Sequence, residues 1–315
     1  MSEALSAMPP GHAFPSRGQA AGSFAFHLWI AAAAAVVLIT GVIGCALTRI
    51  HAGDVGSRIL AVVIVLAVFQ ALPLYWHRKG RYALRDSSLT VLWAALLWTI
   101  LPFPVDVAGR LGRAFPLRDA LLARVDASMG VNVAAIAQWS SHHAIGRAIN
   151  VSYALLGPLL VLSFLVPGLA GRATAVKRLL VANLAAFAIG LPIFACMPAI
   201  GPWYGEHFAA NRGQATCQAD ALLLREPGAY EHHPAGVICF PSFHVMWAIV
   251  CAQALAASFR RLRWPAWILA ALIVISTMTT GWHYFADVLG GFALAGASLS
   301  AARALVRTPA SHRVW

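Results

Sequence analysis

A histidine and an aspartate near the end of the chain have the residue types and the spacing of a catalytic pair. Asp287 follows His283 by four residues and is the last acidic residue of the sequence. In a helix, this spacing places both side chains on one face, where the carboxylate can hold one imidazole nitrogen. Ionisable residues in apolar membrane segments are costly to bury and commonly mark functional sites. We therefore take this pair as the first candidate for chemistry.

A second histidine follows a helix-start signal. Pro241 and Ser242 come just before His244, at the point where a polar loop passes into an apolar run. Proline suits the first position of a helix, and a helix N-terminus offers free N–H groups and a positive dipole end to an anion. The hydroxyl of Ser242 adds a further donor. We predict that His244 and His283 each lie at the N-terminal end of a helix.

Three kinds of chemistry fit two histidines and one aspartate. A nucleophilic histidine oriented by the aspartate, with the second histidine as acid and base, suits phosphoryl transfer through a phosphohistidine. The same residues could bind a metal ion, or relay protons in a transporter or channel. The remaining alternatives are two interfacial core histidines and a binding protein with a decayed site. Transporters commonly carry inverted repeats, and we find no internal repeat in this sequence.

The composition is that of an integral membrane protein. Of 315 residues, 60% are hydrophobic and 11% are charged, whereas soluble domains have about 25% charged residues. The formal net charge of +12 does not indicate a nucleic-acid partner. Most Lys and Arg residues lie in short loops between apolar runs and form no basic stripe with aromatic residues. The partner that this composition predicts is the lipid bilayer.

Eight apolar runs are long enough to cross a bilayer, each of which requires about 20 residues. The sequence therefore predicts an all-α fold, a polytopic membrane helical bundle. The expected spans are residues 27–48, 59–76, 87–105, 148–167, 178–198, 242–259, 264–281 and 283–304.

The charges of the connecting loops predict the topology. Lys and Arg are more abundant in the segments that are cytoplasmic if the N-terminus is cytoplasmic, so both termini are expected on that side. The spans that begin near His244 and His283 then start at the outer face. Lys79 and Lys177 are the only lysines in a chain rich in Ala and Arg. This bias suggests a bacterial source, and hence the inner (plasma) membrane.

The chain divides by composition into five segments. A small, polar N-terminal tail, which we expect to be disordered, precedes three spans, an outer interfacial region, the catalytic membrane domain and a short C-terminal tail. Their expected bounds are residues 1–26, 27–105, 106–147, 148–305 and 306–315. Within the interfacial region, residues 116–126 have apolar positions at helical spacing and Asp119 on the opposite side, which predicts a helix lying on the outer membrane surface. A helix packed on the bundle fits the same pattern.

The cysteines do not have the spacing of a metal site. Cys217 and Cys239 both fall in the loop of residues 199–240, which we place on the outer face. They could form a disulfide if that face is oxidising, and two unlinked thiols are the alternative.

Together, these residues resemble a known family. Pro241-Ser242-Phe243-His244, followed by Ser276, His283 and Asp287, is similar to the PSGH and SRxxxxxHxxxD motifs of the type 2 phosphatidic acid phosphatase superfamily. Phe-Pro-Ser-x-His and His-Tyr-x-x-Asp, with the Pro-rich stretch 198–204, resemble the inositol phosphorylceramide synthase branch. The resemblance covers about residues 116–305 and implies a six-helix core within the bundle.

The resemblance implies a role for each matching residue. His283 would form the phosphohistidine, and Asp287 would hold its far nitrogen. His244 would protonate the leaving oxygen and then activate the acceptor, while Ser242 would help to bind the phosphate. The implied substrates are a lipid phosphate or phospholipid donor and a hydroxyl acceptor or water. The implied reaction is headgroup transfer at the extracytoplasmic face, with lipid phosphate or polyprenyl (di)phosphate hydrolysis as the alternative. It requires no metal and no other cofactor.

Two departures from the family pattern concern the phosphate. Thr277 stands where the third motif has arginine, and no Arg-Pro pair of the first motif occurs in the chain. A phosphate site still needs positive charge. The expected replacements lie in the polar loop, and we name Arg212 and Arg225 as tentative phosphate ligands, with His232 and His233 nearby. The same departures favour the synthase branch over ordinary phosphatidate phosphatases.

Overall fold

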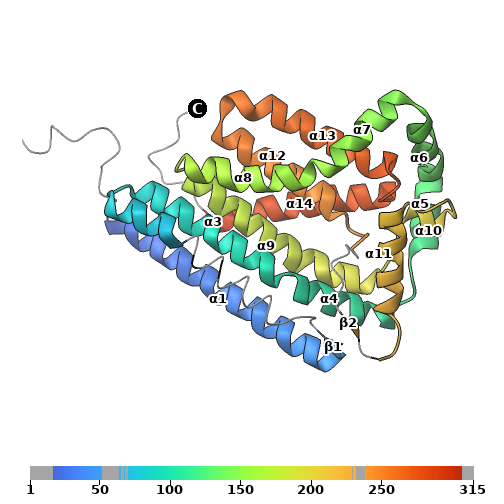
Figure 1. The fold of residues 1–315 in the computed structure, drawn as a ribbon, viewed down its shortest axis with the longest axis horizontal. Helices are drawn as coiled ribbons and strands as arrows, with labels where there is room; N and C mark the ends of the chain where they lie inside the picture. The colour runs from blue at the N-terminus through green and yellow to red at the C-terminus, as the bar shows by residue number, and fades with distance from the viewer. Residues whose placement is uncertain are drawn as a thin grey trace, which may run out of the picture.

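The computed structural model describes residues 17–51, 64, 67, 70–228, 230–231 and 238–306. This part of the chain is a helical bundle, as the hydropathy predicts (Figure 1). The long helices are α1 (Arg17–Thr48), α3 (Tyr82–Ile100), α8 (Leu156–Leu169), α9 (Ala173–Cys196), α12 (Phe243–Ser258), α13 (Arg263–Thr279) and α14 (Phe285–Leu305). Residues 70–78 are also helical.

Shorter elements connect the long helices. The α-helices among them are α4 (Pro102–Leu111), α5 (Asp119–Ser128), α6 (Val133–His142), α7 (Ala144–Ala154), α10 (Pro202–Gly205) and α11 (Arg212–Leu223). Two 3₁₀ turns occupy Gly112–Ala114 and Arg260–Leu262, and the two-residue strands β1 (Ile50–His51) and β2 (Tyr230–Glu231) pair in parallel. Helices α5, α6, α10 and α11 gather at one end of the bundle, which we call the α5 end (Figure 1).

Most of the predicted spans correspond to helices. Among the described residues, five helices are long and apolar enough to cross a membrane, and counting two bent helix pairs gives up to seven. The span predicted at 242–259 is α12, a shorter apolar helix of 16 residues. Much of the span predicted at 59–76 lies outside the described residues. The structure is thus that of a multi-pass membrane bundle.

Three boundaries differ from the sequence predictions. Helix α1 begins at Arg17, so part of the predicted disordered tail is helical. The third predicted span, residues 87–105, is part of two consecutive helices that run from Tyr82 to Leu111, because Pro102 takes the first position of α4, where its missing N–H costs nothing. The span predicted at 148–167 is not straight: α7 and α8 meet at Leu155 with a bend of 45°.

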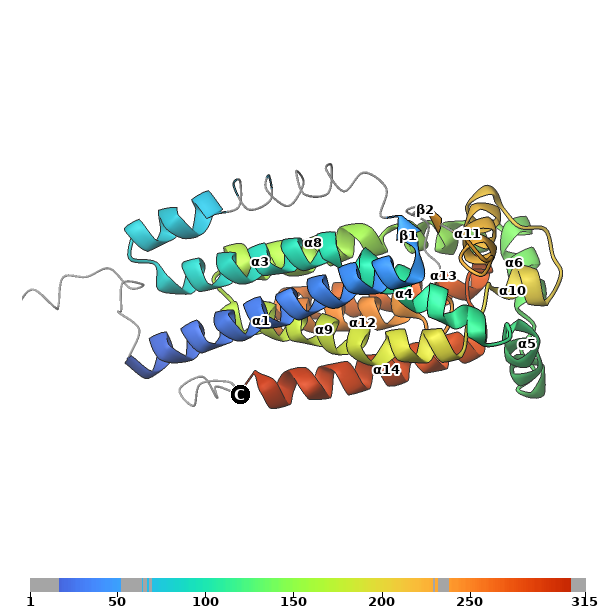
Figure 2. The same ribbon diagram turned by 90° about the horizontal axis from the view of Figure 1, so that it is seen from below.

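Helix α12 lies at the centre of the bundle. It packs against α8, α9, α13 and α14, and Figure 2 shows these helices running along the same axis. An apolar helix without a polar face is expected where neighbours surround it. Accordingly, its residues with no more than 1% exposure are Val245, Met246, Ala248, Val250, Cys251 and Ala252. The helix that carries His244 is therefore held by the core on several sides.

A buried arginine ties the N-terminal helices to the polar loop. The Arg110 guanidinium, in α4, donates to the carbonyls of Leu224 (2.9 Å) and Glu226 (2.6 Å), and also to that of Gly228. Its Nε donates to the carbonyl of Thr48 at the end of α1. Because Arg110 is only 2% exposed, this guanidinium satisfies backbone carbonyls in the interior and does not act as a solvated loop charge.

Candidate active site

The nucleophile candidate lies in the connection between α13 and α14. The carbonyl of Thr277 accepts hydrogen bonds from the amides of Trp282 (3.0 Å) and His283 (3.1 Å). Gly281 has a φ of 72°, a left-handed conformation that glycine adopts without steric cost. The chain therefore turns sharply, and α14 begins only at Phe285. The prediction that His283 is part of the helix is wrong. His283 lies in this turn, two residues before the first helical residue, Phe285.

Asp287 holds His283 from the first turn of α14. Its Oδ2 lies 3.3 Å from His283 Nδ1. The same oxygen accepts hydrogen bonds from the Tyr284 amide at 2.9 Å and from the Cys239 thiol at 3.0 Å. Asp287 is 0% exposed and His283 is 3% exposed. The predicted contact is therefore present, but it joins a residue before the helix to one in its first turn, and not two residues on one helix face.

The second histidine enters from the start of α12. Ser242 is the N-cap: its Oγ accepts the Val245 amide at 3.3 Å, and its own amide donates to the carbonyl of Asp287 at 3.1 Å. The sequence predicts Pro241 at the first helical position. In the structure it precedes the N-cap, and the first helical residue is Phe243. Helices α12 and α14 approach closely here, since a Cβ on Gly291 would lie 2.6 Å from the Ser242 carbonyl oxygen. The close approach brings His244 to the His283 segment.

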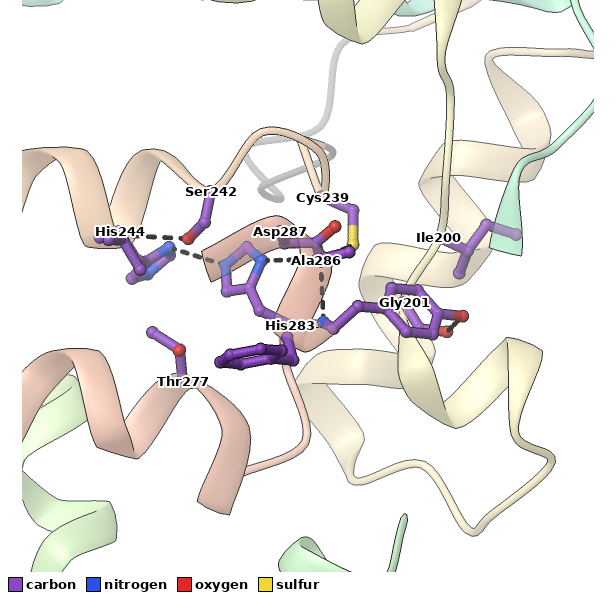
Figure 3. Close-up of polar contacts among 12 residues, drawn as sticks. Ile200, Gly201, Cys239, Ser242, His244, Thr277, His283, Ala286 and Asp287 are labelled. Carbon is purple, nitrogen blue, oxygen red and sulfur yellow. Dashed lines mark hydrogen bonds and ion pairs between the residues drawn. The ribbon is translucent and has the colours of Figure 1, made fainter. Parts of the chain in front are cut away.

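The two histidines face each other. His283 Nε2 lies 3.4 Å from His244 Nδ1, so His283 has Asp287 on one ring nitrogen and His244 on the other (Figure 3). A phosphoryl group on His283 Nε2 would therefore form next to His244. This is the order of groups that a nucleophile with a separate acid and base requires.

Aromatic rings fix the plane of His244. The ring of Tyr153, from α7, stacks on His244 with centroids 4.6 Å apart and planes at 18°. Trp282 also stacks with Tyr153, with centroids 5.9 Å apart, and Trp203 meets Trp282 edge to face. His244 is partly exposed, whereas His283 is buried. His244 is therefore the more accessible of the two histidines.

The surroundings set the protonation of the reactive groups. Burial lowers the pKa of His283 to about 4, so its imidazole is neutral and nucleophilic at neutral pH. Burial also raises the pKa of the Cys239 thiol well above its usual range, and the nearby Asp287 raises it further. Cys239 thus remains a hydrogen-bond donor to the carboxylate.

Three of these residues could also bind a metal ion. Ligand atoms of Cys239, His283 and Asp287 lie within 4.8 Å of one another, and thiolate, imidazole and carboxylate are all zinc ligands. A metal ion there would occupy groups that the phosphohistidine chemistry uses. The two roles are therefore alternatives that an experiment can separate.

We expect chelation to leave turnover unchanged within about twofold, because the general acid–base and nucleophilic groups are all supplied by side chains. The purified protein would be assayed after dialysis against EDTA and, in a second sample, a zinc-selective chelator. The same chelators saturated with metal serve as the control. Loss of turnover that one divalent ion restores would show instead that Cys239, His283 and Asp287 are metal ligands.

The structure does not bring the tentative phosphate ligands to the histidines. The Arg225 guanidinium donates to the carbonyls of Gly112 (3.1 Å) and Phe115 (2.7 Å), so it holds the connection before α5. Arg212 is exposed at the first position of α11. That helix does dock beside the site, because Gln214 donates to the carbonyls of Thr280 and Gly281. His232 and His233 lie outside the described residues.

Long-range contacts bear on two alternatives that the sequence leaves open. Cys217 and Cys239 are not joined by a disulfide, and the Cys239 thiol bonds to Asp287 instead. Asp119 does not lie on a solvated helix face: it is 3% exposed, and Asp126 in the same helix is 0% exposed. Both carboxylates accept backbone amides next to the site. Nothing in their local sequence distinguishes them from surface acids, and only their spacing of two helical turns could have suggested a shared face.

Comparison with known proteins agrees with the geometry. A family model described as the PAP2 superfamily matches residues 120–301. The chain belongs to the PAP2 superfamily. The match spans all four residues of the candidate site and more than half of the chain. No curated protein and no solved structure gives a significant match. Membership in the PAP2 superfamily supports a phosphatase-type or phosphotransferase-type activity on lipid phosphates.

Proposed function

We propose that this PAP2 superfamily protein transfers a phosphoryl-containing headgroup from a lipid donor to a hydroxyl acceptor, as the inositol phosphorylceramide synthase branch does. The observation that carries the proposal is the placement of His283 between Asp287 and His244, with ring-nitrogen distances of 3.3 and 3.4 Å. Such a series supplies an orienting carboxylate, a nucleophile and an acid–base group in order.

The reaction proceeds in two displacements. His283 Nε2 attacks phosphorus, the bond from phosphorus to the leaving oxygen breaks, and His244, which enters this step as the imidazolium, gives that oxygen a proton. Asp287 accepts the proton of His283 Nδ1 in a hydrogen bond and stabilises the imidazolium character that develops on the ring. The acceptor hydroxyl then gives its proton to His244 and attacks phosphorus. The phosphorus–nitrogen bond breaks, and both histidines return to their starting states.

The phosphate oxygens are bound at the start of α12. In the described part of the chain, the amides of Phe243 and His244 have no hydrogen-bond partner, as expected for the first turn of a helix. Ser242 accepts a hydrogen bond through Oγ, so its own hydroxyl proton is available as a third donor. Helix N-termini of this kind bind phosphate without a cationic side chain. These three donors compensate in part for the arginine of the family motif, in whose place this chain has Thr277.

The burial of the nucleophile supports transfer over hydrolysis. His283 and Asp287 are 3% and 0% exposed, and the ring of Tyr153 stacks on His244 and on Trp282. A phosphohistidine in such a site is protected from water, so an acceptor with its own binding contacts reacts in preference. We further propose that the site faces the extracytoplasmic side of a bacterial inner membrane, with both termini cytoplasmic, on the distribution of loop charges.

The test is a substrate panel with the purified protein in detergent. Phospholipids, lipid phosphates and a polyprenyl diphosphate are incubated with and without inositol, glycerol or a long-chain alcohol, and free phosphate and lipid products are followed by mass spectrometry. A new phosphodiester lipid that requires both acceptor and His283 supports the transferase. Free phosphate that requires His283 without any acceptor assigns a hydrolase. Substrate flux into vesicles without chemical change would assign a transporter.

Asp287→Asn is expected to lower kcat by about 10²–10⁴-fold, because an orienting carboxylate fixes the imidazole tautomer that attacks. The asparagine amide keeps the size of the side chain, and its oxygen in the Oδ2 position can still accept the Tyr284 amide. A neutral amide, however, does not stabilise the imidazolium character that develops on His283. Turnover is measured on the best substrate of the panel, and the melting temperature shows that the variant is folded. Full activity of this variant would exclude the orienting role.

A further inference from the structure

Helix α5 carries two buried carboxylates on one side. Asp119 and Asp126 are seven residues apart, which is about two helical turns and places them on the same face. They are 3% and 0% exposed. A buried carboxylate is stable only where hydrogen bonds replace its hydration. The partners of these two carboxylates are backbone amides in the segments that adjoin the candidate site.

Asp126 holds the start of α14. Its Oδ2 accepts the Phe285 amide at 2.7 Å and its Oδ1 accepts the Ala286 amide at 2.8 Å. These are the first two amides of the helix, which have no partner within it, and the helix dipole favours a negative charge at this position. Asp126 therefore binds the backbone of the two residues that directly precede Asp287. The N-terminus of α14 is consequently occupied, unlike that of α12.

Asp119 holds the neighbouring connection before α10. Its Oδ1 accepts the Gly201 amide at 2.9 Å, and its two oxygens lie 3.0 and 3.1 Å from the Ile200 amide. The hydroxyl of Tyr284 lies 2.9 Å from the Gly201 carbonyl and 3.1 Å from Asp119 Oδ1. Tyr284 is 0% exposed and follows His283 directly. Asp119 thus reaches the site through Tyr284.

The two carboxylates together span the whole reactive segment. Asp119 fixes the ring of Tyr284 on one side, and Asp126 fixes the amides of Phe285 and Ala286 on the other. Leu122, between them on the same helix, packs in a small core cluster with Tyr284 and Ala286. Every residue between the nucleophile and its orienting carboxylate is therefore bound by α5. A shift of about 1 Å in such a segment can cost about 10²-fold in rate.

We propose that Asp126 and Asp119 of helix α5 are positioning residues that hold Tyr284–Ala286 so that His283 meets Asp287 and His244 in reactive geometry. The expected loss of kcat rests on the proposed function. The hydrogen bonds from the amides of Phe285 and Ala286 to Asp126 do not depend on it. It also gives the stretch 198–204 a role, since Asp119 links the Ile200–Gly201 turn to Tyr284.

The test uses Asp126→Asn in the full-length protein. The asparagine can accept only one of the two amides, because its NH₂ group would face the other N–H. We expect kcat to fall by about 10²-fold, with KM within about twofold of wild type, because Asp126 touches no substrate. Asp119→Asn is expected to have a similar but smaller effect, since it acts through Tyr284.

The matched control is Asp86→Asn. Asp86 is a partly buried carboxylate that binds His27 and Lys177, both at 2.7 Å, near the start of α3, at the end of the bundle opposite α5 (Figure 2). The substitution removes the negative charge of a partly buried ion pair and leaves the site untouched. If Asp86→Asn and Asp126→Asn lower the melting temperature alike but only Asp126→Asn lowers kcat, positioning is supported. Equal kcat losses in the two variants, or wild-type kcat in Asp126→Asn, would overturn it.

A second measurement does not depend on activity. Hydrogen exchange of a peptide that covers residues 282–290, followed by mass spectrometry, should show at least about tenfold faster exchange at Phe285 and Ala286 in Asp126→Asn, since opening this turn costs less once a bond is lost. Unchanged exchange would exclude Asp126 as the group that holds this segment. If the wild-type protein has no His283-dependent activity, the proposed function fails. The hydrogen-exchange measurement then decides by itself whether α5 holds Tyr284–Ala286 in place.

Discussion

His283→Ala will reduce turnover by about 10⁴-fold or more, because loss of the nucleophile removes the covalent route and leaves only substrate binding. His283 Nε2 is the ring nitrogen that faces the acid–base group, and Asp287 holds the opposite nitrogen. Turnover is measured on the substrate that the panel identifies. The wild-type protein should also form a phosphorylated His283 peptide, detected by mass spectrometry at alkaline pH because phosphorus–nitrogen bonds hydrolyse in acid.

The control for this prediction is His143→Ala. His143 is an exposed histidine between α6 and α7 that contacts Trp139, so its loss should leave turnover within about twofold of wild type, as expected for most surface substitutions. An adduct on any residue other than His283, or substantial turnover by His283→Ala, would show that another group is the nucleophile.

His244→Ala will lower turnover of a lipid substrate by about 10²–10⁴-fold, the usual contribution of general acid–base catalysis. The lipid leaving group is an alkoxide, which needs a proton as it departs. An aryl phosphate with an acidic phenol leaves without that help, so the same variant should lose about tenfold or less on it. Both substrates are assayed with one preparation, so the comparison is independent of the folded fraction.

The contrast between the two substrates separates two roles of His244. Its Nδ1 lies 3.4 Å from His283 Nε2, and its ring is stacked on Tyr153, so it is held next to the position of the leaving oxygen. Equal losses on the lipid and the aryl substrate would mean that His244 binds the phosphate and does not act as an acid. A variant that accumulates phosphorylated His283 would show that the second displacement depends on His244 as a base.

Hydropathy was sufficient to predict the helices. Backbone groups in lipid must be bonded within their own segment, so an apolar run of sufficient length forms a helix whatever its neighbours are. The predicted spans 242–259 and 264–281 accordingly agree within about two residues with α12 (Phe243–Ser258) and α13 (Arg263–Thr279). The bend between α7 and α8 was not predictable in this way, because both halves are apolar and the bend depends on packing.

The residues of the candidate site were also named from the sequence, and the structure brings His244, His283, Asp287 and Ser242 together. Motif spacing could identify them because the proposed chemistry requires those residue types. It could not show that His283 lies outside the helix, since the turn at Gly281 depends on a glycine conformation and on the carbonyl of Thr277.

The sequence by itself therefore determined the membrane class, the helices and the residues of the candidate site, because hydropathy and residue type are local properties. Only the tertiary structure decided which polar side chains support these residues. The sequence predicts Asp119 opposite the apolar positions of its helix and Arg225 as a phosphate ligand, and it assigns no role to Asp126. Their partners are backbone groups far away in the chain: Asp126 binds the amide of Phe285, 159 residues later. A buried charge is stable only beside such partners, and packing alone brings them together.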